Sequence, residues 1–295
     1  MVTGASGLIG RAVVEALVER DEVRATARRP EAADQLRALG AKVATRPLDE
    51  PEDLIEILPR VHTLVHLVGG VNQPDDDALL QANHGSTLAA VAAAKEAGVR
   101  RVVLVSVPGA DPDARDPFLR AKGLAEEAVV HSGLEHAVLR CAHAYGLGGL
   151  WFTATVVASE DGFVVGDGRQ RLAPVSADDV AAVLVAIDDR TGPLEGTWQL
   201  EGPDVLDADG LFALLDDGDR VPEHVASDDA ARRLADLLGR LVWPSATRHF
   251  AEGTPAATAP DAAVAFGLQR TPLDEGLRTT AARAAEAAAR VPGDA

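Results

Sequence analysis

Short runs of apolar and β-branched residues alternate with longer stretches of helical spacing through the first two thirds of the chain. In the longer stretches apolar residues recur every three or four positions, as at Ile9, Val13 and Leu17. The short runs have the length of buried strands, and they are Val23–Ala27, Lys42–Thr45, Thr63–Val68, Arg101–Ser106 and His136–Arg140. This alternation predicts βαβ units, and therefore an α/β fold with a doubly wound parallel sheet covered by helices on both faces.

The pattern changes after Gly146, where glycine-rich turns become frequent. Ser176–Asp179 has the composition of a helix start, and Trp198–Leu200 reads as one more strand. Ala251–Ala263 is rich in Pro, Ala, Thr and Gly, which predicts a loop or linker. An alanine-rich helix then leads to a short tail, Val291–Ala295, which we expect to be disordered.

The most informative local motif is a glycine-rich loop near the start of the chain. Three glycines spaced three apart leave no side chain between the backbone and an incoming pyrophosphate, and a helix that begins near Gly7 would direct its free N–H groups at that anion. Only Met1 and Val2 precede the loop, so the first strand is either shortened or brief. The motif predicts a Rossmann-type dinucleotide site whose contacts come from Gly4, Ser6, Gly7, Leu8, Ile9 and Gly10.

Composition and charge exclude several classes of protein. The chain has 295 residues, 47% of them hydrophobic, which suits a globular protein. Its net charge of −18 argues against nucleic-acid binding, which needs clustered cations. The ten acids between Glu201 and Asp229 predict a solvated surface. No apolar run is long enough to span a membrane and no signal peptide is recognised, so we expect a cytoplasmic protein.

Neither the single cysteine nor the eight histidines predict a metal-binding site. Cys141 is the single cysteine, so neither an intramolecular disulfide nor a cysteine-based zinc site is available. We expect no metal site at the histidines. A buried, inert thiol is the expected state of Cys141.

The end of the second predicted strand points to one of the two nicotinamide cofactors. An NAD site places a carboxylate about 20 residues beyond the glycine loop to hold the ribose hydroxyls. This strand ends instead in Arg28-Arg29, and paired guanidinium groups suit the 2′-phosphate of NADP(H). We therefore expect NADP(H), with Arg28 the better placed of the two.

Taken together, these motifs resemble the extended and atypical short-chain dehydrogenase/reductases. The resemblance covers about residues 1–202 and is closest to the branch of the NmrA-like proteins and the NAD(P)-binding 39 kDa-type subunit of respiratory complex I. Its marks are T-G-A-S-G-L-I-G at Thr3–Gly10, the V-R-A-T-A-R-R-P strand end, L-D-E-P-E-D-L at Leu48–Leu54, V-H-L-V-G-G at Val65–Gly70, S-V-P-G-A-D-P from Ser106, V-S-A-D-D-V from Val175 and L-E-G-P-D-V at Leu200–Val205.

The resemblance implies further cofactor contacts, and the change of pattern after Gly146 predicts a domain division. Leu48 and Asp49 would lie by the adenine, and Leu67, Val68 and Gly69 would run beneath the cofactor. Residues 1–200 would form the NADP-binding domain, with 147–173 contributing to a substrate-side cap. Residues 201–295 would complete that small, mostly helical cap. The family includes monomers and homodimers, and nothing in the chain selects between them.

The family's catalytic pattern is incomplete in this chain. Family members use a serine after the fifth strand and a Tyr-x-x-x-Lys pair, in which the lysine lowers the pKa of the phenol that transfers the proton. The matching segment here begins with Phe118 and ends with Lys122, so the lysine is present and the phenol is absent. Ser106 occupies the serine position, or it is a strand-end hydroxyl bonded to backbone. Lys122 is expected to hold the nicotinamide ribose.

Other polar and aromatic residues follow the sixth predicted strand. His143 could supply the proton that Phe118 cannot, because imidazole titrates near neutral pH. It could equally be a loop histidine bonded to backbone. Phe118, Tyr145, Trp151 and Phe152 are the expected lining of an apolar substrate pocket. For Tyr145, the alternative is packing under the loop, and for Trp151 and Phe152 it is anchoring of the cap.

Three functions remain open from the sequence. The first is an NADPH-dependent reductase or isomerase of a small, apolar carbonyl, enone or imine, with Ser106, Lys122 and His143 as the catalytic candidates. The second is a non-catalytic NADP(H)-binding protein that senses redox state or supports a partner complex. The third is an epimerase or dehydratase of nucleotide sugars, which ranks last because such enzymes also depend on the absent phenol.

Overall fold

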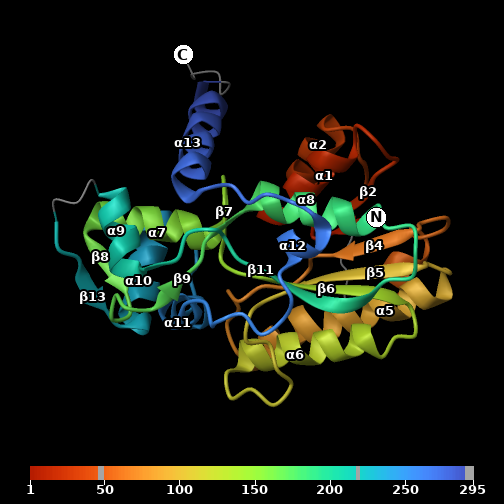
Figure 1. Ribbon diagram of the computed structural model, residues 1–295, viewed down its shortest axis with the longest axis horizontal. Helices are drawn as coiled ribbons and strands as arrows, with labels where there is room; N and C mark the ends of the chain where they lie inside the picture. Colours follow the sequence, from red (N-terminus) through yellow and green to blue (C-terminus); the bar gives the residue numbers. More distant parts are fainter. Residues whose placement is uncertain (46–49, 217–219, 290–295) are drawn as a thin grey trace.

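The computed structural model describes residues 1–45, 50–216 and 220–289, and a seven-stranded parallel sheet forms its centre (Figure 1). All neighbouring strands run parallel, in the order β11-β6-β5-β4-β1-β2-β3. The strands are β1 (Val2–Thr3), β2 (Arg24–Ala27), β3 (Lys42–Thr45), β4 (Thr63–His66), β5 (Arg101–Ser106), β6 (Glu135–Cys141) and β11 (Glu195–Leu200). The five strands predicted from apolar runs are confirmed to within two residues, and so is the doubly wound sheet.

Side chains of the central strands alternate between two buried faces. Val103 and Leu139 point into one core, and Leu104 and Val138 point into the other. A parallel sheet with both faces covered needs such continuous apolar strands. In Figure 1, α1 (Leu8–Leu17), α2 (Pro30–Ala38) and α8 (Ala177–Asp188) lie above the sheet and α5 (Ser86–Glu96) and α6 (Pro117–Val130) below it.

The strand order reverses between β1 and β4, at the middle of the sheet. Open α/β sheets bind their ligands in the crevice at such a point, beyond the carboxyl ends of the strands. Short elements follow β4 at this edge: α4 (Asp76–Leu80) and a single π-helical turn, η1 (Gln81–Gly85). The short helix α3 (Glu52–Ile55) precedes β4 and packs against α5.

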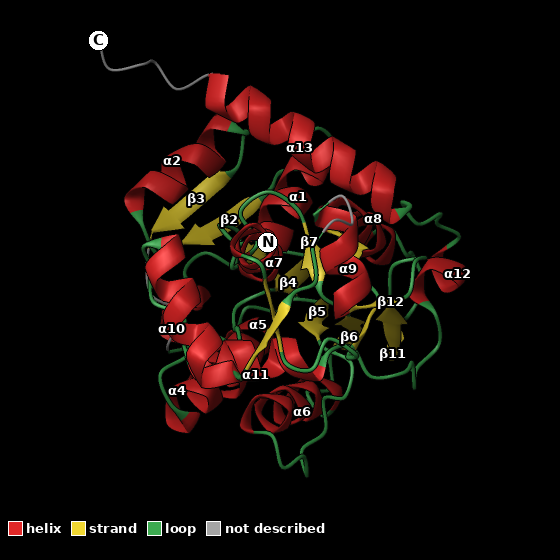
Figure 2. Cartoon of the chain, turned by 90° about the vertical axis from the view of Figure 1, so that its left-hand side faces the viewer, coloured by secondary structure: helices red, strands yellow, loops and turns green. Residues whose placement is uncertain are grey.

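A second body of structure covers the carboxyl ends of the strands and has its own apolar core (Figure 2). Most of its residues come from beyond the sixth strand of the sheet. It consists of β7 (Ala144–Tyr145), α7 (Leu150–Asp161), β8 (Phe163–Val165), β9 (Arg171–Leu172), β10 (Val175–Ser176), β12 (Leu206–Asp207), α9 (Ala208–Leu215), β13 (Glu223–Val225), α10 (Ser227–Leu238) and α11 (Pro244–Glu252). We call this body the cap.

The loop in the structure is shorter than the linker predicted over residues 251–263. Its ends are helical, since α11 ends at Glu252 and α12 (Ala262–Phe266) begins at Ala262. Between them, the chain leaves the cap and returns to the sheet: Gln199 N–H donates to Pro260 O at 2.9 Å, and Gln199 forms a parallel bridge with Asp261. We call residues 253–261 the return segment. α12 then packs on the same core as α1 and α8.

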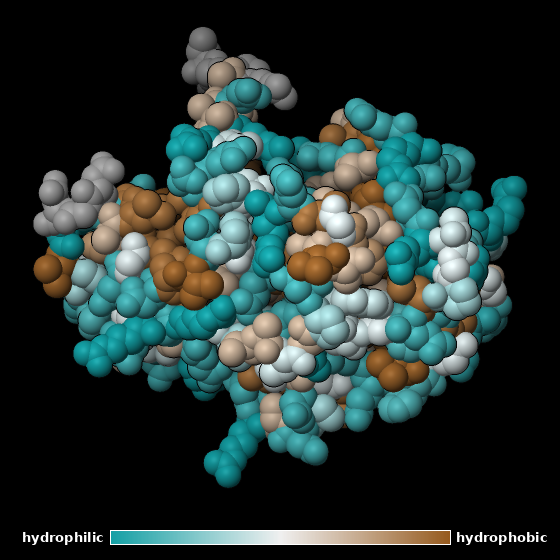
Figure 3. All heavy atoms as spheres, in the orientation of Figure 1, coloured by the Kyte–Doolittle hydropathy of each residue, from teal (hydrophilic) through white to brown (hydrophobic). Residues whose placement is uncertain are grey.

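The last helix, α13 (Leu273–Ala289), projects from the body (Figure 1), and the tail expected to be disordered lies outside the described residues. Hydrophilic residues cover most of the face in Figure 3. The acidic stretch contributes exposed side chains, as predicted, among them Asp204, Asp207, Glu223, Asp228 and Asp229. Within the described ranges, no helix has both the length and the apolar character required to cross a membrane.

Candidate functional site

The glycine loop joins β1 to α1 with a backbone that only glycine allows. Gly4 has φ +65°, and a Cβ there would lie 2.8 Å from the carbonyl of Leu67. A Cβ on Gly10 would lie 2.4 Å from Gly4 O, so α1 packs directly against the loop. Gly7 is the N-cap of α1 and provides no side-chain cap. The first amides of the helix therefore stay open at the switch point, which confirms the predicted helix start and fits a cofactor pyrophosphate.

The predicted 2′-phosphate residues lie at the tip of β2. Arg28 follows the strand and Arg29 is the N-cap of α2, and both side chains are exposed. No ion pair holds either guanidinium among the described residues. Leu48 and Asp49, the adenine contacts that the resemblance implies, lie outside the described residues.

The loop after β4 forms the floor of the site beside the glycine loop. Leu67 and Gly69 line a cavity there, whereas the side chain of Val68 packs against the core on the opposite face of the sheet. Gly69 has φ +133°, and a Cβ at this position would lie 2.5 Å from Oδ1 of Asn83. The close approach fixes this loop beneath the glycine-rich turn.

Asn83, which the sequence analysis did not select, holds the β4 loop. It lies in η1 and is buried. Its Oδ1 accepts from Gly70 N at 3.0 Å, and its Nδ2 donates to Gly70 O at 3.2 Å and to Leu79 O at 2.9 Å. Wide helical turns of this kind often occur at functional sites. An asparagine within a buried, alanine-rich helical pattern was the available signal.

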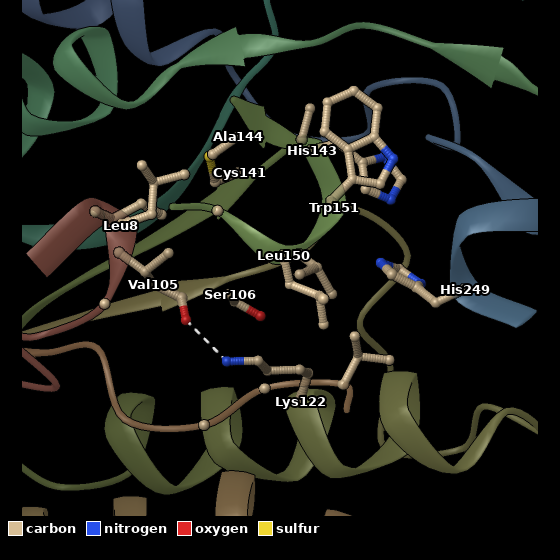
Figure 4. Close-up of a pocket in the computed structure, with 18 of the residues that line it drawn as sticks. Leu8, Val105, Ser106, Lys122, Cys141, His143, Ala144, Leu150, Trp151 and His249 are labelled. Carbon is tan, nitrogen blue, oxygen red and sulfur yellow. Dashed lines mark hydrogen bonds between the residues drawn. The ribbon is translucent and has the colours of Figure 1, made fainter. Parts of the chain in front are cut away.

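Ser106 and Lys122 meet at the end of β5 (Figure 4). The Lys122 ammonium donates to Val105 O at 3.1 Å, and burial lowers its pKa to about 8 against the opposing charge of Glu126. The buried Ser106 Oγ has no hydrogen-bond partner in the described part of the chain. The backbone-bonded alternative for Ser106 is therefore not what the structure shows, and its hydroxyl is available to a ligand. Phe118 lies on α6 and also lines the cavity.

His143 lies in the loop after β6 and stacks on Trp151, with ring centroids 4.9 Å apart. Its Nδ1 lies 3.3 Å from Thr254 Oγ1, and its Nε2 has no partner in the described ranges. Burial, and then the neighbouring His249, hold the pKa of His143 well below its usual value, so the ring is neutral at pH 7. Nearby, burial raises the pKa of the Cys141 thiol to about 12, which agrees with the inert thiol expected from the sequence.

His249 enters the same space from α11 and was missed by the sequence analysis. Its ring centroid lies 5.1 Å from that of His143 and 4.9 Å from that of Phe118, whose ring it meets edge on. Burial lowers its pKa to about 4, while the charge of Asp116 opposes the shift. The sequence offers no local signal for this residue, because it comes more than a hundred positions after His143 and from a different element.

These elements enclose one cavity of about 310 Å³ between the sheet and the cap (Figure 4). This volume is at the lower end of the roughly 300–1,000 Å³ typical of small-molecule sites. The cavity runs from the glycine loop to the apolar side chains of the cap. Its lining includes Gly4, Gly7, Leu8, Ile9, Gly10, Leu67, Gly69, Ser106, Phe118, Lys122, Cys141, His143, Leu150, Trp151, His249, Phe250 and Thr254.

Three predicted site residues lie elsewhere. Ser6 faces a separate groove between α1 and α13. Tyr145 is buried in the core of the cap, and its ring lies beside Phe152 at 5.9 Å. The pairing of β7 with β10 directs this tyrosine toward α13, where its hydroxyl packs against Gly276. The packing alternative therefore describes Tyr145 and Phe152, whereas Trp151 and Phe118 line the cavity.

Comparisons with known proteins agree with this geometry. A family model described as NAD(P)H-binding matches residues 4–190. The chain is 30% identical over 209 residues to the (4-alkanoyl-5-oxo-2,5-dihydrofuran-3-yl)methyl phosphate reductase of Streptomyces griseus, covering 70% of this chain and 69% of that protein. It is 28% identical over 239 residues to the mitochondrial NADH dehydrogenase (ubiquinone) 1 alpha subcomplex subunit 9 of Arabidopsis thaliana, covering 73% and 56%.

The structural comparison supports the same fold. The Citrobacter sp. triphenylmethane reductase, solved in complex with NADP(H), superposes with a TM-score of 0.73 at 21% identity over 95% of this chain and 98% of that one. The chain spans only about half the length of some curated relatives that it matches, the Arabidopsis subunit among them. The resemblance to the branch that contains the complex I subunit is confirmed, and the chain belongs to the NAD(P)H-binding family.

Proposed function

We propose that this protein is an NADPH-dependent reductase of a small, apolar carbonyl, enone or imine. The observation that carries the proposal is the convergence of Ser106 and Lys122 in a cavity that is continuous with the glycine loop and closed by the cap. A site that only held a cofactor would not need the space beyond these two residues. The reductase named among the relatives supports the reaction class.

Different residues of the chain have different roles in such a reaction. When bound, reduced nicotinamide supplies a hydride. The open amides of α1 hold the pyrophosphate, and Lys122, fixed on Val105 O, lies next to the β4 loop where it can bond a ribose hydroxyl. The unpartnered Ser106 hydroxyl can donate to a substrate oxygen. Trp151, Leu150 and Phe118 exclude water. The proton can come from water, from the substrate itself or from an imidazole such as His143.

Arg28 and Arg29 favour the phosphorylated cofactor over NADH. Their guanidinium groups are exposed at the tip of β2, with no ion pair to an acid in the described ranges, and so are available to a phosphate. The cytoplasmic location and the choice between monomer and homodimer remain predictions.

The second candidate is a non-catalytic NADP(H)-binding protein, and Phe118 favours it because phenylalanine has no transferable proton. NADPH oxidation measured with a panel of quinones, enones and imines separates the two, alongside a fluorescence titration of NADPH. Turnover with any acceptor supports the reductase. Tight binding without turnover across the panel favours the sensor.

A further inference from the structure

The reduction of a carbonyl or an enone requires a proton donor that the family's pattern no longer supplies here. The hydride goes to carbon, and the oxygen that becomes negatively charged takes up one proton. Phe118 occupies the position of the phenol, and Tyr145 is buried in the cap, away from the cavity. Among the groups that face the cavity, two imidazoles, His143 and His249, are not already assigned to the cofactor or to the substrate oxygen. This argument rests on the proposed reductase function.

His249 lies where the missing acid would be needed. Its ring meets the edge of the Phe118 ring at 4.9 Å, and it points into the cavity across from Lys122 and Ser106 (Figure 4). The cap brings it there on α11, which is far from α6 in the sequence. The side chain of a residue at position 249 thus takes up space beside position 118.

The two histidines differ in their hydrogen bonds. Both rings are partly exposed, but Nδ1 of His143 contacts Thr254 and its Nε2 is buried. His249 is half-buried and has no hydrogen bond within the described ranges, so both of its nitrogens are available to substrate or water. A proton donor must be recharged after each turnover, and a ring with both nitrogens free can take a proton from water and pass it to substrate.

The charges around His249 permit a proton to reside there transiently. Asp116, the N-cap of α6, favours the imidazolium. On α11 itself, Glu252 and Arg248 are the neighbouring charged residues and have opposite signs. Lys122, on the neighbouring α6, and a protonated His143 oppose it. Burial keeps the ring neutral at rest, and negative charge developing on a substrate oxygen would favour protonation of the ring.

We propose that His249 is the proton donor for the reduction of neutral carbonyl and enone substrates in this cavity. In the step, a C–H bond forms at the carbonyl carbon or at the conjugated carbon, and the C=O π electrons move to oxygen. Solvent first gives one proton to the neutral ring of His249, and the resulting imidazolium transfers that proton to the oxygen, which returns the ring to its neutral form. The balance is one hydride from the reduced cofactor and one proton from water.

The test compares acceptors that need a proton with one that does not. His249→Gln should lower kcat for menadione and 2-cyclohexenone by about 100-fold or more, as removal of a general acid does. Reduction of crystal violet, a triarylmethane cation that takes up a hydride without a proton, should stay within about three-fold. His224→Gln, an exposed histidine elsewhere in the cap, is the matched control and should change neither.

Two further readouts separate chemistry from packing. NADPH titration should give the same Kd for His249→Gln as for wild type. For wild type, kcat/KM with menadione should fall as pH rises above the imidazole pKa, and His249→Gln should lose this dependence. NMR titration of imidazole-labelled protein should place the His249 pKa below 6.5.

Each opposite result overturns the proposal. Equal losses with menadione and crystal violet would mean that His249 only supports the shape of the cavity. Unchanged menadione reduction would remove its role while leaving the reductase intact. Wild-type protein that binds NADPH but reduces no acceptor would overturn the proposed function, and the role of His249 with it.

Discussion

The two ends of the cavity are built from different parts of the chain and from different kinds of atoms. At the sheet end, the surface is mainly backbone: Gly4, Gly7 and Gly10 expose amides, and the loop at Gly69 lies directly beneath them. At the cap end, the surface consists of side chains such as Trp151, His249 and Phe250. A backbone surface recognises a group common to every dinucleotide, whereas side chains can be exchanged to suit a particular acceptor.

This difference leads to a general expectation for mutations. Changes at the sheet end should alter cofactor affinity, and changes at the cap end should alter turnover of the acceptor while cofactor affinity stays the same. Effects that cross this division would show that the two ends act as one unit.

The largest effect is expected at the glycine loop. Gly10→Ala places a Cβ 2.4 Å from Gly4 O, so the loop must move away from α1. We expect NADPH affinity to fall by more than about 100-fold and the free energy of unfolding to fall by about 1–3 kcal/mol. Isothermal calorimetry and urea denaturation measure the two. Gly192→Ala, which meets no atom within 4 Å and needs no unusual φ, is the control. Native affinity in Gly10→Ala would contradict the assignment of this loop.

The next largest effect is expected for the free energy of unfolding when Lys122, the buried cation of the sheet end, is replaced. The pKa of Lys122 is lowered to about 8, so between pH 8 and about 10.4 the unfolded chain still binds a proton that the folded protein has released. The free energy of unfolding of wild type should therefore rise over this window relative to that of Lys122→Met, by up to about 3 kcal/mol. Urea denaturation at pH 7.5, 9 and 10.5 gives the difference. A difference that is independent of pH would show that this lysine is not buried as described.

A smaller effect is expected at the tip of β2. Arg28→Ala should weaken NADPH binding about ten-fold or more and leave NADH binding nearly unchanged, because only NADPH carries the 2′-phosphate. Titration of both cofactors against wild type and variant provides the measurement. Equal losses for the two would refute a phosphate contact.

The smallest effect is expected at the cap end. His143→Ala removes a ring stacked on Trp151 and bonded to Thr254, and it should lower turnover about ten-fold without changing the Kd of NADPH. Steady-state kinetics with menadione, together with the NADPH titration, tests both halves of the statement. Turnover equal to that of wild type would exclude His143 from the reaction, and a weaker Kd would break the division between the two ends.

The sheet end could be predicted from the sequence because its signals are local. The glycine loop, the strand ends and Lys122 lie within recognisable short patterns, and βαβ units bring the ends of successive strands to the same edge. At the sheet end, Asn83 was missed. Its amide fixes Gly70, but its place in an alanine-rich helical pattern was the only signal, and no motif marks it.

The cap end could not be predicted in the same way. His249 reaches the cavity only because α10 and α11 fold back over the sheet, and no spacing in the sequence records that contact. Tyr145 shows the opposite case. It follows a strand that ends at the site, but the short pairing of β7 with β10 turns the ring into the cap. The end of a strand can be predicted from the local sequence. The direction of a loop side chain cannot, because it depends on long-range packing.

The return segment bears on how related chains could come to act on different acceptors. The chain leaves the sheet after Leu200 and rejoins it at Pro260 and Asp261, which lie beside Gln199. The two junctions of this sixty-residue excursion are therefore neighbours, held by β11. An insertion with adjacent ends can be exchanged as a unit when its contacts with the host are kept, which here include the pairing of β12 with β9 and of β13 with β8. A graft of residues 201–260 from a related chain should thus transfer acceptor preference onto the same cofactor-binding sheet.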